Sequence, residues 1–99
     1  MSPEILKLAE AAGRAAGAEK VVLFGSQARG DASDESDIDL ALILPDDAER
    51  RTALRAAIRA TVNRRRPLDL IVLSHTTWQK RNTLLARQVR DEGILAYGR

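Results

Sequence analysis

The sequence has no cysteine and very few aromatic residues. Its 99 residues include one Phe, one Trp and one Tyr, and only three prolines. The lack of cysteine excludes disulfide bonds, thiolate metal sites and a cysteine nucleophile. No apolar run approaches the length that spans a membrane, and the N-terminus lacks the apolar segment of a signal peptide. We therefore expect a cytoplasmic protein that has no membrane contact.

The composition is that of an ordinary soluble domain. Hydrophobic residues make up 44% of the chain and charged residues 30%. A chain of 99 residues is long enough to bury one core, but too short for a catalytic domain with a separate substrate domain. We expect residues 1–99 to form a single domain.

Charge is distributed unevenly along the chain. Residues 1–49 carry four Lys or Arg and eleven Asp or Glu, a net charge of −7, whereas residues 50–99 carry twelve and three, a net charge of +9. Such asymmetry is typical of a polyanion-binding face. It is equally compatible with acidic and basic faces that neutralise each other within one fold. The arginines are not interleaved with aromatic residues, so we do not expect specific binding of nucleic acid.

Turn residues and hydrophobic periodicity predict helices that alternate with short strands. The expected helices run from the Ser2-Pro3-Glu4 start to Gly17, from the Asp46–Glu49 capping pair to the Arg64–Pro67 run, and from about Arg81 to Glu92. The expected strands are Lys20–Phe24, Ile38–Leu44 and Leu68–Leu73, with Ile94–Tyr97 as a short fourth strand or a docked tail. This order favours an α/β (α+β) fold in which a small mixed sheet of three to four strands packs against helices.

Apolar stripes predict which helix faces lie inward. In the second helix the stripe consists of Leu54, Ala57, Ile58, Thr61 and Val62. In the last helix we expect the inward residues to be Leu84, Leu85 and Val89. Trp78, one of the three aromatic residues, is expected to anchor the last helix in the core or to form part of a partner interface.

Three carboxylates occur in or next to apolar strands. Asp37 and Asp39 are separated only by Ile38, so their side chains share one face about 6.5–7 Å apart along the strand. Asp69 lies in the next apolar run, where an unpaired charge is costly. Magnesium prefers such oxygen ligands together with substrate phosphates. If the third strand lies beside the second, the three acids predict a site with two Mg²⁺ ions for phosphoryl or nucleotidyl transfer.

A glycine-serine turn precedes the acid pair. Gly25 lets the backbone turn sharply and approach a ligand closely, and Ser26 offers a hydroxyl group and an amide that suits phosphate. Arg29 is a candidate phosphate-binding or loop-bracing cation, or else a surface residue. Ser36 either orients the acids by hydrogen bonding or is an ordinary loop residue. Together with the acids, this turn predicts a site for a nucleoside triphosphate.

The segment FGSQARGDASDESDIDL resembles the motif of the DNA polymerase beta-like nucleotidyltransferase superfamily. Asp69, in PLDLIVL, resembles the third carboxylate of that family, and the short chain is similar to the minimal nucleotidyltransferase (MNT) proteins. The resemblance implies a nucleotidyltransferase-like fold and transfer of a nucleoside monophosphate from a triphosphate, with ATP as the usual donor, to a hydroxyl group. It implies that Gly25 and Ser26 bind the triphosphate, that Asp37 and Asp39 hold Mg²⁺, and that Asp69 is a ligand or base.

Minimal members of that superfamily are often antitoxins encoded beside a HEPN-domain ribonuclease toxin. The resemblance therefore implies a HEPN-type toxin as the partner and a tyrosine hydroxyl of that toxin as the acceptor of AMP. Larger members carry a second domain that this sequence lacks, so we expect neither tRNA nor a small molecule to be the main acceptor. Two alternatives stay open: an antitoxin that neutralises by binding alone, and a nucleotidyltransferase that acts on a small molecule.

Overall fold

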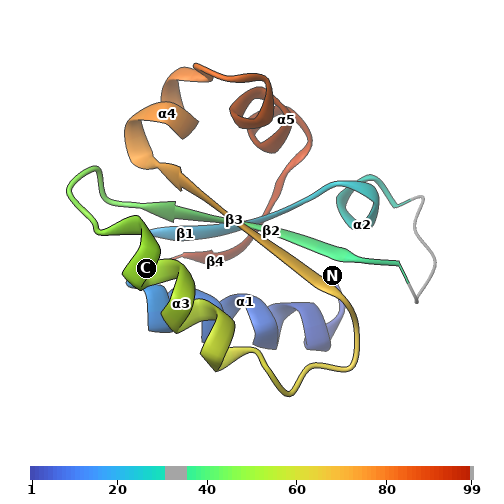
Figure 1. Cartoon of the computed structure of the whole chain (residues 1–99). Coiled ribbons are helices and arrows are strands. Elements are labelled where there is room, and N and C mark those ends of the chain that lie inside the picture. Colours follow the sequence, from blue (N-terminus) through green and yellow to red (C-terminus); the bar gives the residue numbers. More distant parts are fainter. Residues whose placement is uncertain (31–35, 99) are drawn as a thin grey trace.

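The computed structural model describes residues 1–30 and 36–98, which form one four-stranded sheet covered by helices (Figure 1). The strands are β1 (Lys20–Phe24), β2 (Ile38–Leu44), β3 (Leu68–Ser74) and β4 (Ile94–Gly98). The helices are α1 (Pro3–Ala16), α2 (Ser26–Arg29), α3 (Arg50–Ala60), α4 (His75–Lys80) and α5 (Leu84–Glu92). The predicted α/β fold is therefore confirmed, and the segment after Gly93 is a strand.

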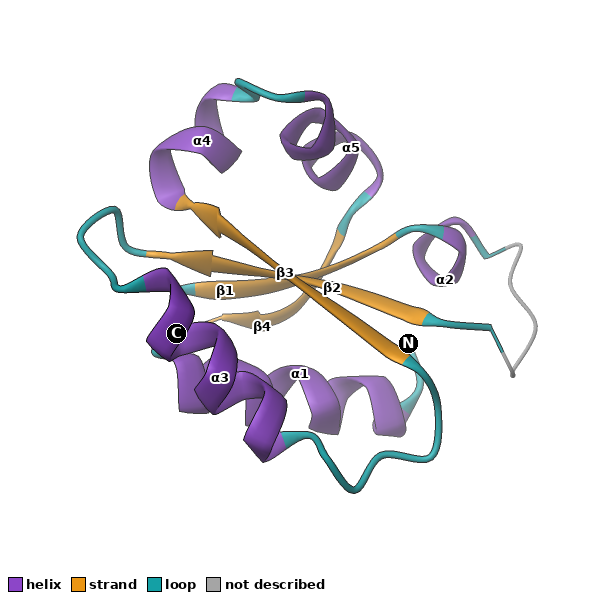
Figure 2. Cartoon of the chain, in the orientation of Figure 1, coloured by secondary structure: helices purple, strands orange, loops and turns teal. Residues whose placement is uncertain are grey.

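The sheet is mixed, with the strand order β3-β2-β1-β4. β1 pairs antiparallel with both β2 and β4, whereas β2 and β3 are parallel and are connected through α3. Parallel strands need such a crossover connection. Figure 2 shows α1 and α3 on one face of the sheet and α4 and α5 on the other.

Alternation along β2 supplies the two cores. Its residues Ile38, Leu40, Leu42 and Leu44 are buried in the cluster that also holds alanines of α1 and α3. Ala41 and Ile43 belong to the second cluster, with Val89 of α5. Because side chains alternate across a strand, one strand contributes to both cores. Trp78 packs, partly buried, against the second cluster, as expected of a core anchor.

Helix α1 begins and ends at the predicted residues. The Ser2 side chain accepts a hydrogen bond from the Ile5 amide at 3.3 Å, and Pro3 is the first helical residue. Gly17 ends the helix with φ 67°, a left-handed conformation that glycine adopts without strain.

Helix α3 differs from the prediction at both ends. Glu49 caps it alone, since its carboxylate accepts from the amides of Arg51 and Thr52. Asp46 accepts instead from the Thr76 amide at 2.9 Å, so its expected capping role is wrong. The helix ends at Ala60, before the arginine run.

The predicted inward face of α3 is partly wrong. Ile58 and Val62 are 47% and 58% exposed, whereas Ala53, Ala57 and Thr61 are buried. Helices α1 and α3 pack against each other and bury alanines in the same core. Small side chains let two helices approach closely, so α3 turns its alanine face inward and leaves its larger apolar residues outside.

The last helical region also differs. It contains two helices, α4 and α5, and α5 begins after the Thr83 cap instead of at about Arg81. Val89 is buried as predicted, but Leu84 and Leu85 are 80% and 39% exposed. The side chains of Leu84 and Leu85 therefore point away from the core, and Ala86 of the same turn is buried in their place. Across residues 1–30 and 36–98, each helix is too short or too polar to cross a membrane.

Two leucines with opposite environments test this packing. Leu42 is completely buried in the core of β2, and we expect Leu42→Ala to lower the free energy of unfolding by about 2–5 kcal/mol. Leu84, which is 80% exposed, is the matched control, and Leu84→Ala should change stability by less than about 0.5 kcal/mol. Urea unfolding measures both, and similar losses in the two variants would contradict the packing.

Candidate functional site

The candidate site forms where β1 ends and where β2 and β3 begin. The antiparallel pairing of β1 with β2 places Phe24 opposite Asp39, so the turn at Gly25 lies beside the acids of β2. The parallel pairing of β2 with β3 places Asp39 opposite Asp69. Residues that are thirty positions apart in the sequence thereby become direct neighbours on one sheet.

Asp39 is at the centre of a cluster of negative charge. Its side chain is partly buried and lies beside that of Asp69 across the β2–β3 pairing, while Asp37 and Asp69 are exposed to solvent. Burial, and then the charge and hydrogen bond of Asp69 and the charge of Asp37, raise the pKa of Asp39 above its ordinary value. The charge of Arg29 opposes this shift only weakly. The cluster therefore favours binding of a proton or a cation.

Gly25 makes room for Asp39. Its φ is 75° and its ψ is −156°, a conformation that is almost restricted to glycine. A Cβ atom at this position would overlap Oδ2 of Asp39. The turn therefore needs glycine both for its backbone conformation and for the close approach of the carboxylate.

Ser26 begins the single helical turn α2, which was predicted as a short turn after the strand. The amides of Ala28 and Arg29 both donate to the Gly25 carbonyl at 3.1 Å, and Gly30 ends the turn with φ 80°. The Ser26 side chain is half-buried beside the end of β1. Its assigned role in binding a triphosphate stays a prediction.

Glu92 is a site residue that the motifs did not reveal. Its Oε1 accepts hydrogen bonds from the Gly25 amide at 3.2 Å, the Arg29 guanidinium at 3.1 Å and the Gln88 amide group at 2.9 Å. These hydrogen bonds, led by that of Gln88, lower the pKa of Glu92. Of the roles considered for Arg29, this contact supports the brace, because it ties α2 to α5.

The position of Glu92 in the sequence carries a usable signal. It is the last residue of α5, where the helix dipole disfavours a negative charge. An acid at such a position indicates that a positive or N–H partner compensates it. Gly93, which follows, confirms the predicted end of the helix.

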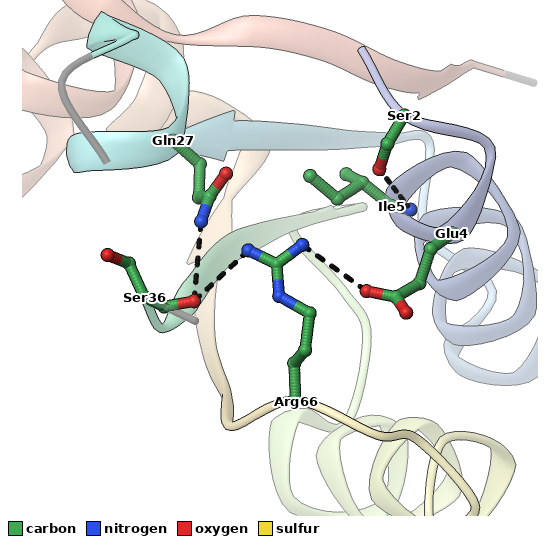
Figure 3. A network of polar contacts seen from close by, with 6 residues as sticks. All are labelled: Ser2, Glu4, Ile5, Gln27, Ser36 and Arg66. Atoms are coloured by element: carbon green, nitrogen blue, oxygen red, sulfur yellow. Dashed lines mark hydrogen bonds and ion pairs between the residues drawn. The ribbon is translucent and has the colours of Figure 1, made fainter. Parts of the chain in front are cut away.

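A second brace holds the entrance to β2 (Figure 3). The Ser36 carbonyl accepts from Gln27 Nε2 at 3.3 Å and from Arg66 Nη2 at 3.2 Å, and Arg66 Nη1 contacts the Glu4 carboxylate at 3.3 Å. The Arg66 side chain is only 16% exposed. Ser36 thus takes part through its backbone, and Arg66 connects α1, α2 and the residue before Asp37. Nothing in the sequence separates Arg66 from its neighbours Arg64 and Arg65.

The donor set suits a hard divalent cation by its chemistry. Asp37, Asp39 and Asp69 offer only oxygen ligands, and their mutual repulsion is relieved when a cation binds. However, in the described ranges no three His, Cys, Asp or Glu side chains are arranged to hold a metal ion as they stand. The carboxylates would have to move to bind one ion together. Convergence of all three acids on metal stays a prediction.

Comparison with known proteins identifies the family of the chain. The profile of the family described as polymerase beta, nucleotidyltransferase matches residues 7–99. The chain belongs to the polymerase beta nucleotidyltransferase family. A search of curated proteins found no match. The predicted membership of the superfamily is therefore confirmed, while the narrower assignment to MNT antitoxins stays a prediction.

Two solved structures are similar to this nucleotidyltransferase-family chain. A crystal structure at 1.40 Å of a proposed nucleotidyltransferase from Sulfolobus solfataricus has a TM-score of 0.64 and 26% identity, and the match covers 96% of this chain and 81% of the other. The crystal structure of a toxin-antitoxin with AMP-PNP has a TM-score of 0.63 and 24% identity, and the match covers 97% of this chain and 72% of the other. The second likeness shows a shared fold.

Gly25 can be tested against Gly30, another glycine with positive φ. A Cβ at Gly30 meets no atom within 4 Å, whereas one at Gly25 would overlap Asp39. We expect Gly25→Ala to destabilise the protein by at least about 1 kcal/mol more than Gly30→Ala, because only Gly25 combines strain with a clash. Thermal and urea unfolding measure the difference, and equal losses would show that the close approach to Asp39 is unimportant.

The raised pKa of Asp39 predicts a pH-dependent effect on stability. The folded protein holds the Asp39 proton more tightly than the unfolded chain does, so ionisation of Asp39 opposes folding at neutral pH. Without divalent metal, Asp39→Asn should therefore be more stable than the wild type at pH 7. The advantage should fade as the pH falls through the raised pKa of Asp39 toward the ordinary value of 3.8, and it should be lost below 3.8, where Asp39 is protonated in both states.

Asp47→Asn, at an exposed position in the turn after β2, is the matched control for loss of one negative charge. Urea unfolding at several pH values compares the three proteins. If Asp39→Asn were the least stable at pH 7, repulsion would not dominate at this position.

Proposed function

We propose that this protein transfers AMP from ATP to a tyrosine hydroxyl of a HEPN-type toxin, with two Mg²⁺ ions, and thereby acts as an antitoxin. The observation that carries the proposal is the pairing of Asp39 with Asp69 next to Gly25. This pairing concentrates carboxylates at the end of a turn of the kind that suits a triphosphate. Membership of the nucleotidyltransferase family supports the reaction class.

The toxin-antitoxin structure supports the choice of nucleotide and partner. That assembly contains AMP-PNP, an analogue of ATP, and one of its chains shares the fold of this protein over 97% of the present chain. A protein partner and an adenine nucleotide are therefore the first candidates to test here.

The acids have separate proposed roles. Asp37 and Asp39 would hold the metal ions, and Asp69 would complete the site as a ligand or would accept the proton of the attacking hydroxyl. Bound Mg²⁺ would supply charge stabilisation on the phosphates and a lower pKa of the acceptor hydroxyl. Asp39 would ionise fully on metal binding, because the repulsion that raises its pKa would then be compensated.

The residues of the turn would orient the triphosphate. Gly25 lets the backbone approach closely, and Ser26 would contribute its hydroxyl and amide. The Gly25 amide already donates a hydrogen bond to Glu92. We therefore propose that Gly25 makes room for the triphosphate and does not donate a hydrogen bond to it. Arg29, through Glu92, would keep the turn rigid while the nucleotide binds.

Radiolabelling tests the function directly. The protein would be incubated with Mg²⁺, each α-labelled nucleoside triphosphate and the product of the neighbouring gene, and labelled protein would be detected on a gel. We expect label on the toxin only with ATP. We also expect Asp39→Asn to lower transfer by at least about a hundredfold, because loss of a group that acts in the transition state costs several kcal/mol.

Asp47→Asn is the control and should transfer AMP at the wild-type rate. A stable complex without label would show that the protein neutralises by binding, and a labelled small product without any protein acceptor would show a small-molecule nucleotidyltransferase. Full activity of Asp39→Asn would disprove the site assignment.

A further inference from the structure

An apolar groove runs between α3 and the edge strand β3. It consists of two hollows that share Leu54. One has a volume of about 240 Å³ and is lined by Ile58, Leu68 and Leu70, and the other has about 350 Å³ and is lined by Ile71 and Val72. We call this surface the α3–β3 groove.

The floor of the groove consists of apolar side chains that are partly exposed to solvent. The orientation of α3 described above leaves Leu54 and Ile58, four residues apart, on the outer side of the helix, and Ile58 is 47% exposed. Apolar residues at this spacing form a continuous stripe along a helix. Exposed apolar surface of this kind, next to half-buried strand residues, is typical of interaction sites.

The edge of the groove is only partly closed. β3 is the last strand of the sheet order, so one side of it has no paired strand among the described residues. Arg50 covers one backbone group there, since its Nη2 donates to the Val72 carbonyl at 2.8 Å. A charged side chain over an edge strand discourages pairing with another strand. A helix is therefore a better occupant than a strand.

The rim of the groove is positively charged. Arg50, Arg51 and Arg64 line it. The segment 50–68 contains seven arginines and no Asp or Glu. An acidic occupant is favoured by this charge, and the apolar floor favours a protein over a nucleic acid.

A second copy of this chain does not supply such an occupant. Helix α1 carries two acids and two bases, α5 is likewise balanced, and α3 and α4 are basic. Thus none of the described helices is acidic. The described helices of a second copy therefore do not complement the positive rim, and a different protein is the better occupant.

We infer that the α3–β3 groove binds an acidic amphipathic helix of a partner protein, in the helix-in-groove mode. The inference rests on the proposed function, because it identifies the surface that would hold the acceptor protein. Leu68 and Leu70, which line the groove, flank Asp69 in β3 but point to the opposite face of the sheet, because side chains alternate along a strand. A partner helix in the groove would therefore lie beside the strand that carries the third carboxylate, and the acceptor group would have to reach the acids around the free edge of β3.

Binding of designed peptides tests this surface. The probe is a fluorescent helical peptide with Leu on one face and Glu on its flanks, and fluorescence anisotropy measures its binding. Its counterpart with Lys in place of Glu and a short single-stranded RNA are compared with it. We expect the Glu peptide to bind, and we expect Ile58→Glu to weaken it by at least about tenfold, because the change removes apolar area and adds a repelling charge.

Leu84→Glu is the matched control, because Leu84 is an exposed leucine on the opposite face of the sheet, and this variant should bind as the wild type does. Circular dichroism would show that both variants are folded. No binding of the Glu peptide, stronger binding of the Lys peptide or of the RNA, or equal weakening by both variants would overturn the inference. Self-association of the chain that Ile58→Glu abolishes would do so as well.

Peptide binding needs neither nucleotide nor the acid cluster, so Asp39→Asn should bind the peptide normally. If the Glu peptide binds but no AMP is transferred to the toxin, the groove assignment stands and the proposed function is rejected. If the Ile58→Glu variant still transfers AMP to the toxin at the wild-type rate, the proposed function stands and the role of the groove in holding the acceptor protein is rejected.

Discussion

Parallel pairing of β2 with β3 is the constraint on which the candidate site depends. Its register places Asp39 opposite Asp69, and burial and repulsion then raise the pKa of Asp39. A shift of one residue would move Asp69 to the other face of the sheet, because side chains alternate along a strand. The buried residues of β2, such as Leu42, hold this register. The relative positions of the acids therefore depend on the packing of the core.

The turn between β1 and α2 is held from two sides. Glu92 of α5 binds the Gly25 amide and the Arg29 guanidinium, while Arg66 and Gln27 bind the Ser36 carbonyl at the entrance to β2 (Figure 3). These braces come from opposite faces of the sheet. Contacts from elements distant in the sequence therefore position the Gly-Ser turn and the residue that precedes the acid pair.

Close packing of α1 on α3 has a second consequence. Because the alanine face of α3 turns toward α1, its larger apolar residue Ile58 stays exposed beside β3. The same rotation brings arginines of α3 to the rim of that surface. The residues that a helical period assigns to the core are therefore available to a partner.

The sequence by itself determined the first three strands, the first helix and the nucleotidyltransferase motif, and left Ile94–Tyr97 open between a strand and a docked tail. These features are local: alternation sets β2, the Ser2 cap sets α1, and the spacing from Gly25 to Asp39 lies within one hairpin-like unit. Tertiary structure decided the partners of Glu92 and Arg66 and the inward face of α3. These contacts and this orientation depend on how elements that are distant in the sequence pack together. The apolar stripe of one helix does not show which side of the stripe a neighbouring helix will cover.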